Sequence, residues 1–525
     1  MTTKKRNVTA TATELLSDFA IKNNADDLPD FGLCILSAFC IIYEKCTFFV
    51  AITAKKWYNI IYPQKGIRRE LVLTQYIEKI KEIIGKSSEI PLCYVHSFGC
   101  QQNVSDGERI LGLLSSCGYG ITSEPDSAQL ILYNTCAVRE NAENKVYGII
   151  GELKHLKEKN PDLIIGLCGC MAQEPKTVEK IRSTYKQVDL IFGTHALSEL
   201  PHLLYDVLTK RKFVYDTDEH TEVPLKISSV RQSSFKTGVP IMYGCDNFCS
   251  YCIVPYVRGR EKSRDPEDIL EEIRELAENG YKEIMLLGQN VNSYGKGLDE
   301  PISFSEMLRR INKIEGDFKI RFMSPHPKDC THELIDTILE CEKVCKHLHL
   351  PLQSGSDEIL KKMNRKYTAE KYMETVDYVR SKVPDFSLTT DIIVGFPNET
   401  YEDFLKTKEI VEKVKFDNIY SFIYSKRSGT KAAEMVDNTS DEDKSRWMTE
   451  LLAVQREVSS ENYKRFMGRE LEVLFDAQSR HKGFITGKSD EFIIVEAEGD
   501  DSLIGQRRKV KITKTYNWAV SGEII

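Results

Sequence analysis

The pattern of hydrophobic and polar positions changes along the chain, and its first clear regularity begins at residue 91. Short apolar runs there alternate with segments of helical periodicity. The predicted strands are residues 92–96, 130–133, 163–167 and 188–192. The predicted helices between them are residues 107–115, 143–157 and 177–185. This alternation predicts a doubly wound α/β domain with a parallel sheet.

A second α/β series follows a polar connection at about 205–235. Its predicted strands are residues 239–243, 283–287, 319–323, 347–352, 388–394 and 418–424. Its predicted helices include residues 266–279, 304–314 and 369–382, and a charged amphipathic helix at 443–463 closes the series. Six such units predict an open, partial (β/α)6 barrel rather than a small sheet.

The last 60 or so residues change again, to short alternating strands separated by glycine and charged turns. The predicted strands are residues 470–475, 483–486, 492–495, 509–515 and 519–525. This pattern favours a small antiparallel β-barrel.

The first 90 residues differ from the rest. Residues 31–54 are apolar, but Glu44 and Lys45 interrupt them, and a charge at the centre of a membrane span costs roughly 2.5–3.5 kcal/mol. A buried or interface-lying helix is therefore favoured over a span, and residues 71–86 read as an amphipathic helix. The predicted domains are residues 1–90, an extension of unknown role, and 91–207, 231–463 and 464–525.

Composition and charge narrow the class of protein. The chain has 525 residues with 72 Lys and Arg against 79 Asp and Glu, a formal charge of −7. This net charge excludes a basic tail protein. The chain is 41% hydrophobic and 29% charged, which excludes a fibre and a polytopic membrane protein. Fifteen cysteines without a secretory signal indicate reduced thiols and metal binding. We expect a cytoplasmic protein without a stable membrane partner.

The sharpest chemical signal is a C-x3-C-x2-C triplet, Cys245, Cys249 and Cys252, just past a predicted strand. Three thiolates are one short of the four that fill a [4Fe–4S] cluster. The iron without a protein ligand can chelate the amino and carboxylate groups of a methionine derivative. Zinc is the alternative, but no fourth ligand lies at finger-like spacing.

Three further cysteines, Cys100, Cys136 and Cys170, each follow a predicted strand of the first series. Parallel strands present their carboxyl ends at one edge of a sheet, so these thiols can converge. Small residues flank each sulfur, as a bulky cluster requires. Ordinary buried cysteines are the alternative reading.

The triplet and its flanks, residues 240–245 and 255–260, resemble the methylthiotransferase family of radical S-adenosylmethionine enzymes. The contexts of the other three cysteines resemble the amino-terminal domain of that family. The resemblance implies two [4Fe–4S] clusters. Cys245, Cys249 and Cys252 would hold the cluster that binds S-adenosylmethionine, and Cys100, Cys136 and Cys170 an auxiliary cluster.

Amide and small residues at other strand ends suit a pocket for S-adenosylmethionine. By resemblance we assign Gln289, Ser354 and Asp391 to it. His326 also follows a strand, and either faces this pocket or is a structural histidine. A zinc site can be drawn from four further residues, but a helix end and a strand separate its halves: Cys341, Cys345, His347 and His349.

The carboxyl-terminal segment carries basic and aromatic residues that suit RNA, since cations contact phosphates and rings stack on bases. They are Arg507, Arg508, Lys509, Lys511, Lys514, Tyr516 and Trp518. A solvated edge strand is the alternative reading. The segment resembles a TRAM module, a small RNA-binding barrel.

Residues 192–195 and 424–430 resemble most the family branch that modifies isopentenylated adenosine in tRNA. The implied reaction adds a methylthio group to C2 of that base, beside the anticodon. This C–H bond has no acidic proton, so radical chemistry is needed. The implied partners are the tRNA, an electron donor such as flavodoxin or ferredoxin, and a sulfur source. N6-threonylcarbamoyladenosine and a ribosomal-protein aspartate are alternative acceptors, and a non-catalytic iron–sulfur RNA-binding protein is a remote alternative.

Overall fold

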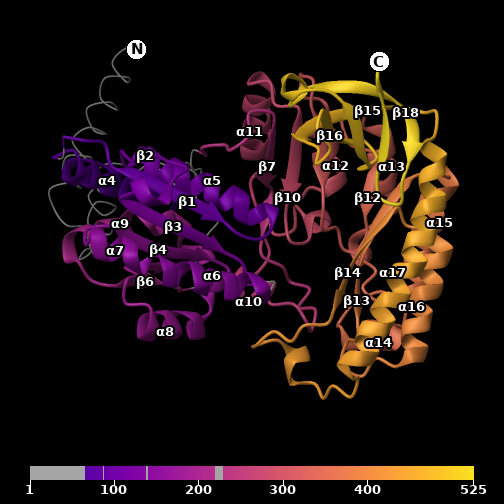
Figure 1. Cartoon of the computed structure of the whole chain (residues 1–525), viewed down its shortest axis with the longest axis horizontal. Helices are drawn as coiled ribbons and strands as arrows, with labels where there is room; N and C mark the ends of the chain where they lie inside the picture. Colours follow the sequence, from indigo (N-terminus) through magenta and orange to yellow (C-terminus); the bar gives the residue numbers. More distant parts are fainter. Residues whose placement is uncertain (1–64, 87, 138–139, 219–228) are drawn as a thin grey trace, which may run out of the picture. The chain divides into compact units, whose positions relative to one another are not determined.

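Six parallel strands form the first sheet, in the order β2-β1-β3-β4-β5-β6 (Figure 1). The structure is a computed structural model that describes residues 65–86, 88–137, 140–218 and 229–525. Residues 72–525 form one compact unit, to which this description applies. The strands are β1 (Leu92–Ser97), β2 (Gly120–Ile121), β3 (Leu130–Thr135), β4 (Ile164–Gly169), β5 (Leu190–Phe192) and β6 (Val214–Asp216). The helices are α4 (Lys65–Ile84), α5 (Gln101–Ser116), α6 (Glu140–Glu152), α7 (Lys154–Lys159), α8 (Pro175–Thr184) and α9 (Leu200–Lys210).

Helices cover both faces of this sheet because successive side chains of a strand point to opposite sides. Leu130 and Leu132 of β3 belong to an apolar core that α5 and α9 complete. Ile131 and Tyr133 of the same strand belong to a second core, completed by α6, α7 and α8. The predicted doubly wound parallel sheet is confirmed.

The edges of this sheet are where the structure departs from the predicted elements. β2 and β6 are too short for a periodic pattern, and the predicted helix 143–157 is divided into α6 and α7. β6 lies beyond residue 207, and Ile80 of α4, on the other side of residue 91, is part of the domain's core. The four domain boundaries remain predictions.

The apolar segment 31–54 and the first 64 residues lie outside the described residues. Within the part of the chain that the structure does describe, no helix combines the length and the apolar character that crossing a membrane requires.

Six parallel strands also form the central part, in two sheets of three, β11-β10-β7 and β12-β13-β14. A parallel bridge between Ile320 and Val344 joins the two sheets into one arc. The strands are β7 (Lys236–Pro240), β10 (Glu283–Leu287), β11 (Lys319–Phe322), β12 (His347–His349), β13 (Ser387–Val394) and β14 (Asn418–Ile423). Among the described residues no pairing joins β14 to β7, so the arc is an open, partial barrel as predicted.

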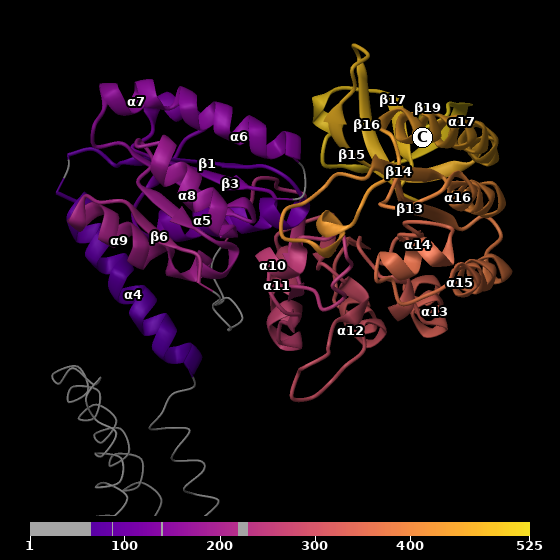
Figure 2. The ribbon, with the colours of Figure 1, turned by 90° about the horizontal axis from the view of Figure 1, so that it is seen from below.

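Helices pack on the outer side of this arc, where Figure 2 shows α15, α16 and α17 beside β13 and β14. They are α11 (Pro266–Glu278), α12 (Phe304–Asn312), α13 (His332–Glu340), α14 (Asp357–Lys362), α15 (Ala369–Lys382), α16 (Tyr401–Val414) and α17 (Asp441–Tyr463). A short ribbon of β8 (Met242–Tyr243) and β9 (Lys262–Ser263) and the one-turn helix α10 (Val254–Val257) lie at the carboxyl end of β7. This ribbon and helix position the first cysteine triplet.

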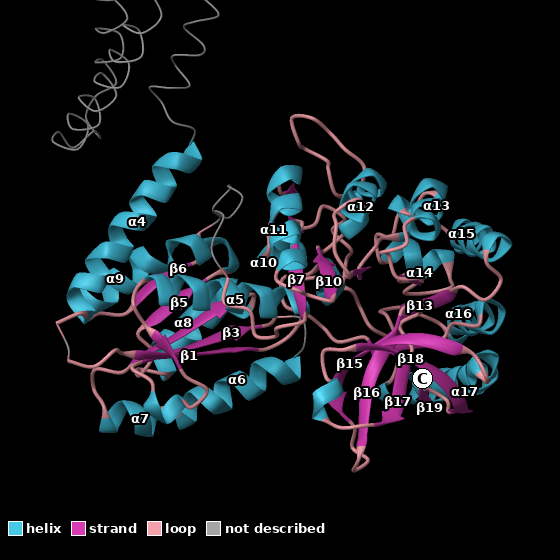
Figure 3. Ribbon diagram, turned by 90° about the horizontal axis from the view of Figure 1, so that it is seen from above, coloured by secondary structure: helices cyan, strands magenta, loops and turns pink. Residues whose placement is uncertain are grey.

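The carboxyl-terminal strands form a closed barrel in the order β15-β16-β17-β19-β18 (Figure 3). They are β15 (Glu470–Gln478), β16 (Phe484–Ser489), β17 (Ile494–Glu498), β18 (Arg507–Thr515) and β19 (Val520–Ile524). Four neighbouring pairs are antiparallel, but β17 and β19 are parallel. A closed ring with an odd number of strands cannot alternate direction everywhere. The expected antiparallel barrel therefore contains one parallel pair.

Candidate metal centres

Cys100, Cys136 and Cys170, here called the sheet-edge trio, meet at the carboxyl ends of β1, β3 and β4. The Sγ atoms of Cys100 and Cys170 lie 3.5 and 3.7 Å from one acceptor, the Oδ1 atom of Asn103. A Cβ atom added to Gly99, the residue before Cys100, would lie only 2.9 Å from the Sγ of Cys136. The structure therefore brings together three thiols that are far apart in the sequence.

Asn103 connects the three segments that carry this trio. Its Nδ2 donates to the carbonyl of Phe98 at 3.0 Å and to that of Thr135 at 2.8 Å, next to Cys136. The backbone N–H of Cys170 donates to the same Thr135 carbonyl at 3.0 Å. Asn103 is fully buried, so its hydrogen bonds fix the geometry of the sheet edge rather than competing with water.

Cys245, Cys249 and Cys252, here called the loop trio, lie on one turn between β8 and α10. Gly244 has a φ of +73°, and a Cβ atom there would lie 2.1 Å from the carbonyl oxygen of Arg260. Only glycine fits this turn without moving the backbone. Burial raises the pKa of Cys245 to about 11 and that of Cys252 to about 12. Metal binding requires thiolates, so a metal or a nearby cation must supply positive charge.

Two arginines that sequence reasoning did not assign to the site supply positive charge next to the trios. Arg365 donates from Nη1 to the Sγ of Cys249 at 3.4 Å. Arg258 donates from Nη2 to Oδ1 of Asn103 at 2.8 Å and to the carboxylate of Asp106 at 2.9 Å. Arg258 lies inside the run that carried the family resemblance, but no sequence signal distinguishes Arg365.

Helix α10 connects the two trios. Its residue Val257, together with the preceding Ile253, packs against Ala137 and Cys170 of the sheet-edge region. Ile253 in turn follows Cys252 directly. One short helical segment therefore contacts the sheet-edge trio and directly follows the loop trio, which brings the two trios close together.

Three free thiols in each trio are the ligand set of a [4Fe–4S] cluster with one iron that the protein does not bind. The twelve cysteines of the described residues are all free thiols. In that part of the chain, no three His, Cys, Asp or Glu side chains are placed to bind one metal ion. Each thiolate of a cubane binds a different iron, so three cluster ligands lie further apart than three ligands of one ion. The assignment of six ligands remains a proposal.

The zinc site that could be drawn from the sequence does not assemble. Cys341 is buried in the main core of the barrel. The ring of His347 stacks on Phe492, with 4.7 Å between centroids, and His349 lies 3.3 Å from Asp391. These groups are satisfied by their own protein neighbours.

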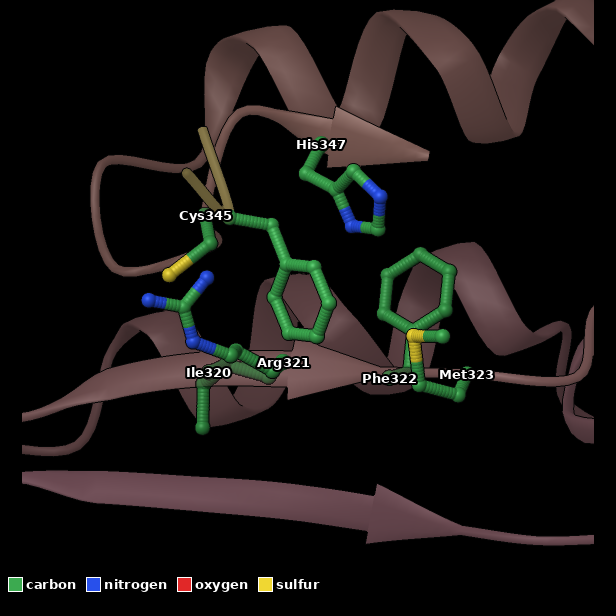
Figure 4. Close-up of a pocket in the computed structure, with 7 residues that line it drawn as sticks. Ile320, Arg321, Phe322, Met323, Cys345 and His347 are labelled. Atoms are coloured by element: carbon green, nitrogen blue, oxygen red, sulfur yellow. The ribbon is translucent and has the colours of Figure 1, made fainter. Parts of the chain in front are cut away.

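A cavity of about 10 Å³ lies beside His347 and Cys345, between β11 and β12 (Figure 4). The guanidinium of Arg321 points toward the sulfur of Cys345 there. This volume is on the order of a single water. It is far too small for a nucleoside, so this cavity is not the pocket expected for S-adenosylmethionine.

The three residues assigned to that pocket have different surroundings. The Oε1 of Gln289 is buried without a hydrogen-bond partner in the protein, as expected of an atom that accepts a hydrogen bond from a ligand. Asp391 is only partly buried and contacts His349. Ser354 is fully buried, and its hydroxyl lies 3.4 Å from that of Thr407 and accepts from the backbone of Ser356. The three assignments stay predictions, and Ser354 has the weakest geometric support.

His326 is buried, and it is neutral because burial lowers its pKa to about 2. Its Nδ1 accepts from the backbone N–H of Lys328 at 3.2 Å, so the proton resides on Nε2. That Nε2 has no hydrogen-bond partner among the described residues. One ring nitrogen of His326 therefore has a hydrogen-bond partner and the other does not. An unpaired N–H donor fits a residue that faces a ligand pocket better than one with a purely structural role.

The basic residues of the terminal barrel separate into two groups. Arg507 forms an ion pair with Asp317 at 3.1 Å and donates to the carbonyl of Lys282, so it holds the barrel against the central part. The side chains of Tyr516 and Trp518 are 47% and 66% exposed. Lys509, Lys511 and Lys514 are also exposed. These five side chains leave rings and cations free to contact RNA.

Comparisons with known proteins agree with this organisation. Family models match the Radical SAM superfamily at residues 239–411, the Uncharacterized protein family UPF0004 at 92–193 and the TRAM domain at 464–525. A radical S-adenosylmethionine methyltransferase structure from Kitasatospora setae matches with a TM-score of 0.49 and 13% identity, over 66% of this chain and 74% of that one. That similarity is too distant to bear on function.

Two similar curated relatives carry one name, tRNA-2-methylthio-N(6)-dimethylallyladenosine synthase. The relative from Thermoanaerobacter pseudethanolicus is 50% identical over 85% of this chain and 96% of its own length. The relative from Acetivibrio thermocellus is 48% identical over 89% of this chain and 97% of its own length. The chain therefore belongs to the tRNA-2-methylthio-N(6)-dimethylallyladenosine synthase family of radical S-adenosylmethionine methylthiotransferases.

Proposed function

We propose that this enzyme adds a methylthio group to C2 of N6-isopentenyladenosine beside the anticodon of tRNA. The observation that carries the proposal is the pair of cysteine trios that α10 connects, in a chain that matches relatives of that name over nearly their whole length. Its cofactors are iron–sulfur clusters and S-adenosylmethionine.

The reaction replaces hydrogen on an aromatic carbon, where no proton is acidic and no group can leave. Positioned acids and bases contribute typically 10²–10⁴-fold and do not solve this problem. When bound, S-adenosylmethionine and its cluster supply the radical chemistry that the reaction needs. The protein contributes ligands, orientation and exclusion of water.

Within this proposal, Cys245, Cys249 and Cys252 hold the cluster that binds S-adenosylmethionine. Cys100, Cys136 and Cys170 hold the auxiliary cluster. The loop trio is fixed to the barrel from outside its own turn, since the Nδ2 of Asn364 donates to the carbonyls of Asn247 and Phe248 at 3.1 and 2.8 Å.

Gln289, Ser354 and Asp391 are the proposed contacts to S-adenosylmethionine. The unpaired Oε1 of Gln289 can accept a hydrogen bond from its amino group or ribose. Asp391 has a partly exposed carboxylate that can accept from hydroxyls, while His349 holds it in place. Ser354 would contribute mainly its backbone, because its side chain is hydrogen-bonded toward α16.

The terminal barrel is the proposed tRNA-binding element. Stacking of a base on an aromatic ring contributes about 1–3 kcal/mol, and Tyr516 and Trp518 offer two exposed rings. The target base must leave its stack to reach a site between two domains. We further propose an electron donor such as flavodoxin or ferredoxin, a sulfur source, and a cytoplasmic location where tRNA and reduced thiols coexist.

The test is an acceptor comparison with the reconstituted full-length enzyme. Isopentenylated tRNA, threonylcarbamoylated tRNA and the ribosomal protein are each incubated with S-adenosylmethionine and a reductant, and products are identified by mass spectrometry. We expect the methylthio product on isopentenylated tRNA only. Product on another acceptor alone would move the enzyme to another branch, and absence of 5′-deoxyadenosine would favour a non-catalytic iron–sulfur protein.

A further inference from the structure

The two cysteine trios differ in how the nearest guanidinium is compensated. Beside the sheet-edge trio, Arg258 forms an ion pair with Asp106 at 2.9 Å, and both side chains are buried. Beside the loop trio, Arg365 donates to Cys249, to the Tyr367 hydroxyl at 3.0 Å and to the Pro351 carbonyl at 3.1 Å. Within the described part of the chain, Arg365 has no ion pair with a carboxylate, and none is among the groups that act on its pKa.

A partly buried cation without a carboxylate partner is costly unless something else neutralises it. The anionic partner available to Arg365 is the thiolate of Cys249, together with the cluster that the loop trio binds in the proposed function. A cluster with three thiolate ligands is negatively charged, and it becomes more negative when it is reduced. A nearby cation therefore stabilises the reduced form more than the oxidised form.

We propose that Arg365 raises the reduction potential of the loop-trio cluster, and so directs the reducing electron to it rather than to the sheet-edge cluster. The inference rests on the proposed function for the presence of both clusters. Net charge and hydrogen bonds to the sulfurs are known determinants of such potentials. Arg365 provides both. Arg258 acts electrostatically on Cys170 and Cys100, but Asp106 offsets part of its charge and its two hydrogen bonds go to oxygen atoms rather than to sulfur.

Other charges near the loop trio largely cancel. The carboxylate of Glu261 and the ammonium of Lys328 act on the pKa of Cys245 with opposite signs. Lys328 also lies 3.7 Å from the carboxylate of Asp329 and donates to Asn247. Among the described residues, Arg365 is thus a cation beside this trio without a carboxylate partner, whereas Lys328 acts on Cys245 and has the carboxylate of Asp329 at 3.7 Å. This makes Lys328 a matched control.

The test is a redox titration followed by electron paramagnetic resonance. It uses the full-length chain with Cys100, Cys136 and Cys170 replaced by alanine, so that only the loop-trio cluster is present. Arg365→Met removes the charge and the donors, Arg365→Lys keeps the charge, and Lys328→Met removes the compensated cation. No tRNA is needed, so the result is independent of the acceptor.

We expect Arg365→Met to lower the midpoint potential enough to reduce the reduced-to-oxidised ratio at least tenfold, about 59 mV for one electron. Arg365→Lys and Lys328→Met should each change that ratio less than threefold. An unchanged potential in Arg365→Met, or an equal shift in Arg365→Lys or Lys328→Met, would overturn the proposal. Arg365→Gln replaces Arg365→Met if the latter holds no iron, with the same criteria.

If the alanine background itself holds no iron, the titration follows the signal that S-adenosylmethionine perturbs in the chain with both trios. Absence of any iron–sulfur signal from the unaltered chain would instead refute the proposed cofactors. Failure of the inference and failure of the proposed function are therefore distinguishable.

Discussion

The two trios reach similar thiol arrangements by different routes. The loop trio is local: three cysteines on one turn, with Gly244 and Phe248 in the left-handed region at φ of +73° and +47°. The sheet-edge trio is produced by strand register, which pairs Ser97 with Asn134 and Thr135 with Gly169, so that three strands end at the same level. A local site depends on a turn, whereas a distributed site depends on the fold of a whole domain.

The largest effect on product formation is expected when one trio is removed at a time. Replacing the loop trio with alanines should abolish both 5′-deoxyadenosine and methylthio product, because the cleavage site for S-adenosylmethionine is gone. Replacing the sheet-edge trio should abolish methylthio product but retain 5′-deoxyadenosine. Both products are measured by mass spectrometry. Loss of 5′-deoxyadenosine in both variants would show that the trios do not have separate roles.

A smaller effect is expected from Asn103→Ala. The change leaves the carbonyl of Phe98 without this donor, at about 1–3 kcal/mol, while the carbonyl of Thr135 keeps only its bond from the backbone N–H of Cys170. The sheet-edge cluster should then be lost faster on exposure to a chelator, while the loop-trio cluster is retained. Iron release over time measures this. Asn279→Ala, which removes an exposed bond to Glu275, is the control and should behave as the unaltered chain. Equal loss of both clusters would contradict the distributed character of the site.

The smallest effect is expected from Asp106→Asn, which removes the carboxylate that neutralises Arg258. The guanidinium then acts on the sheet-edge cluster uncompensated, and that cluster should become easier to reduce. We expect less than a tenfold change in its reduced-to-oxidised ratio, because Arg258 donates to oxygen atoms rather than to a cysteine sulfur. A redox titration of the chain without the loop trio measures it. A downward shift would contradict the charge argument.

Much of the fold and of both trios could be predicted from the sequence, because periodicity identifies strands and cysteines after strand ends are conspicuous. β2 and β6 could not be predicted, because a strand of two or three residues is too short to show an alternating hydrophobic pattern. The single parallel pair of the terminal barrel follows from closure of five strands, which is a property of the assembled ring.

The arginines show more clearly what could not be predicted from the sequence, namely which groups their side chains contact. Arg365 follows the residue Asn364, which has a φ of +57°, and only the folded chain directs its guanidinium back to Cys249. The sequence pattern groups Arg507 with the residues expected to contact RNA, yet in the structure it forms an ion pair with Asp317 of the central part. Side-chain partners across domains are set by tertiary packing, which a linear pattern does not contain.

The central claim is that six cysteines hold two independent [4Fe–4S] clusters. Anaerobic reconstitution followed by iron and sulfide analysis tests it most directly, on the unaltered chain and on each triple alanine variant. The account predicts about eight irons per chain for the unaltered protein and about four for either variant. Variants that retain all of the iron, or that lose all of it together, would contradict it.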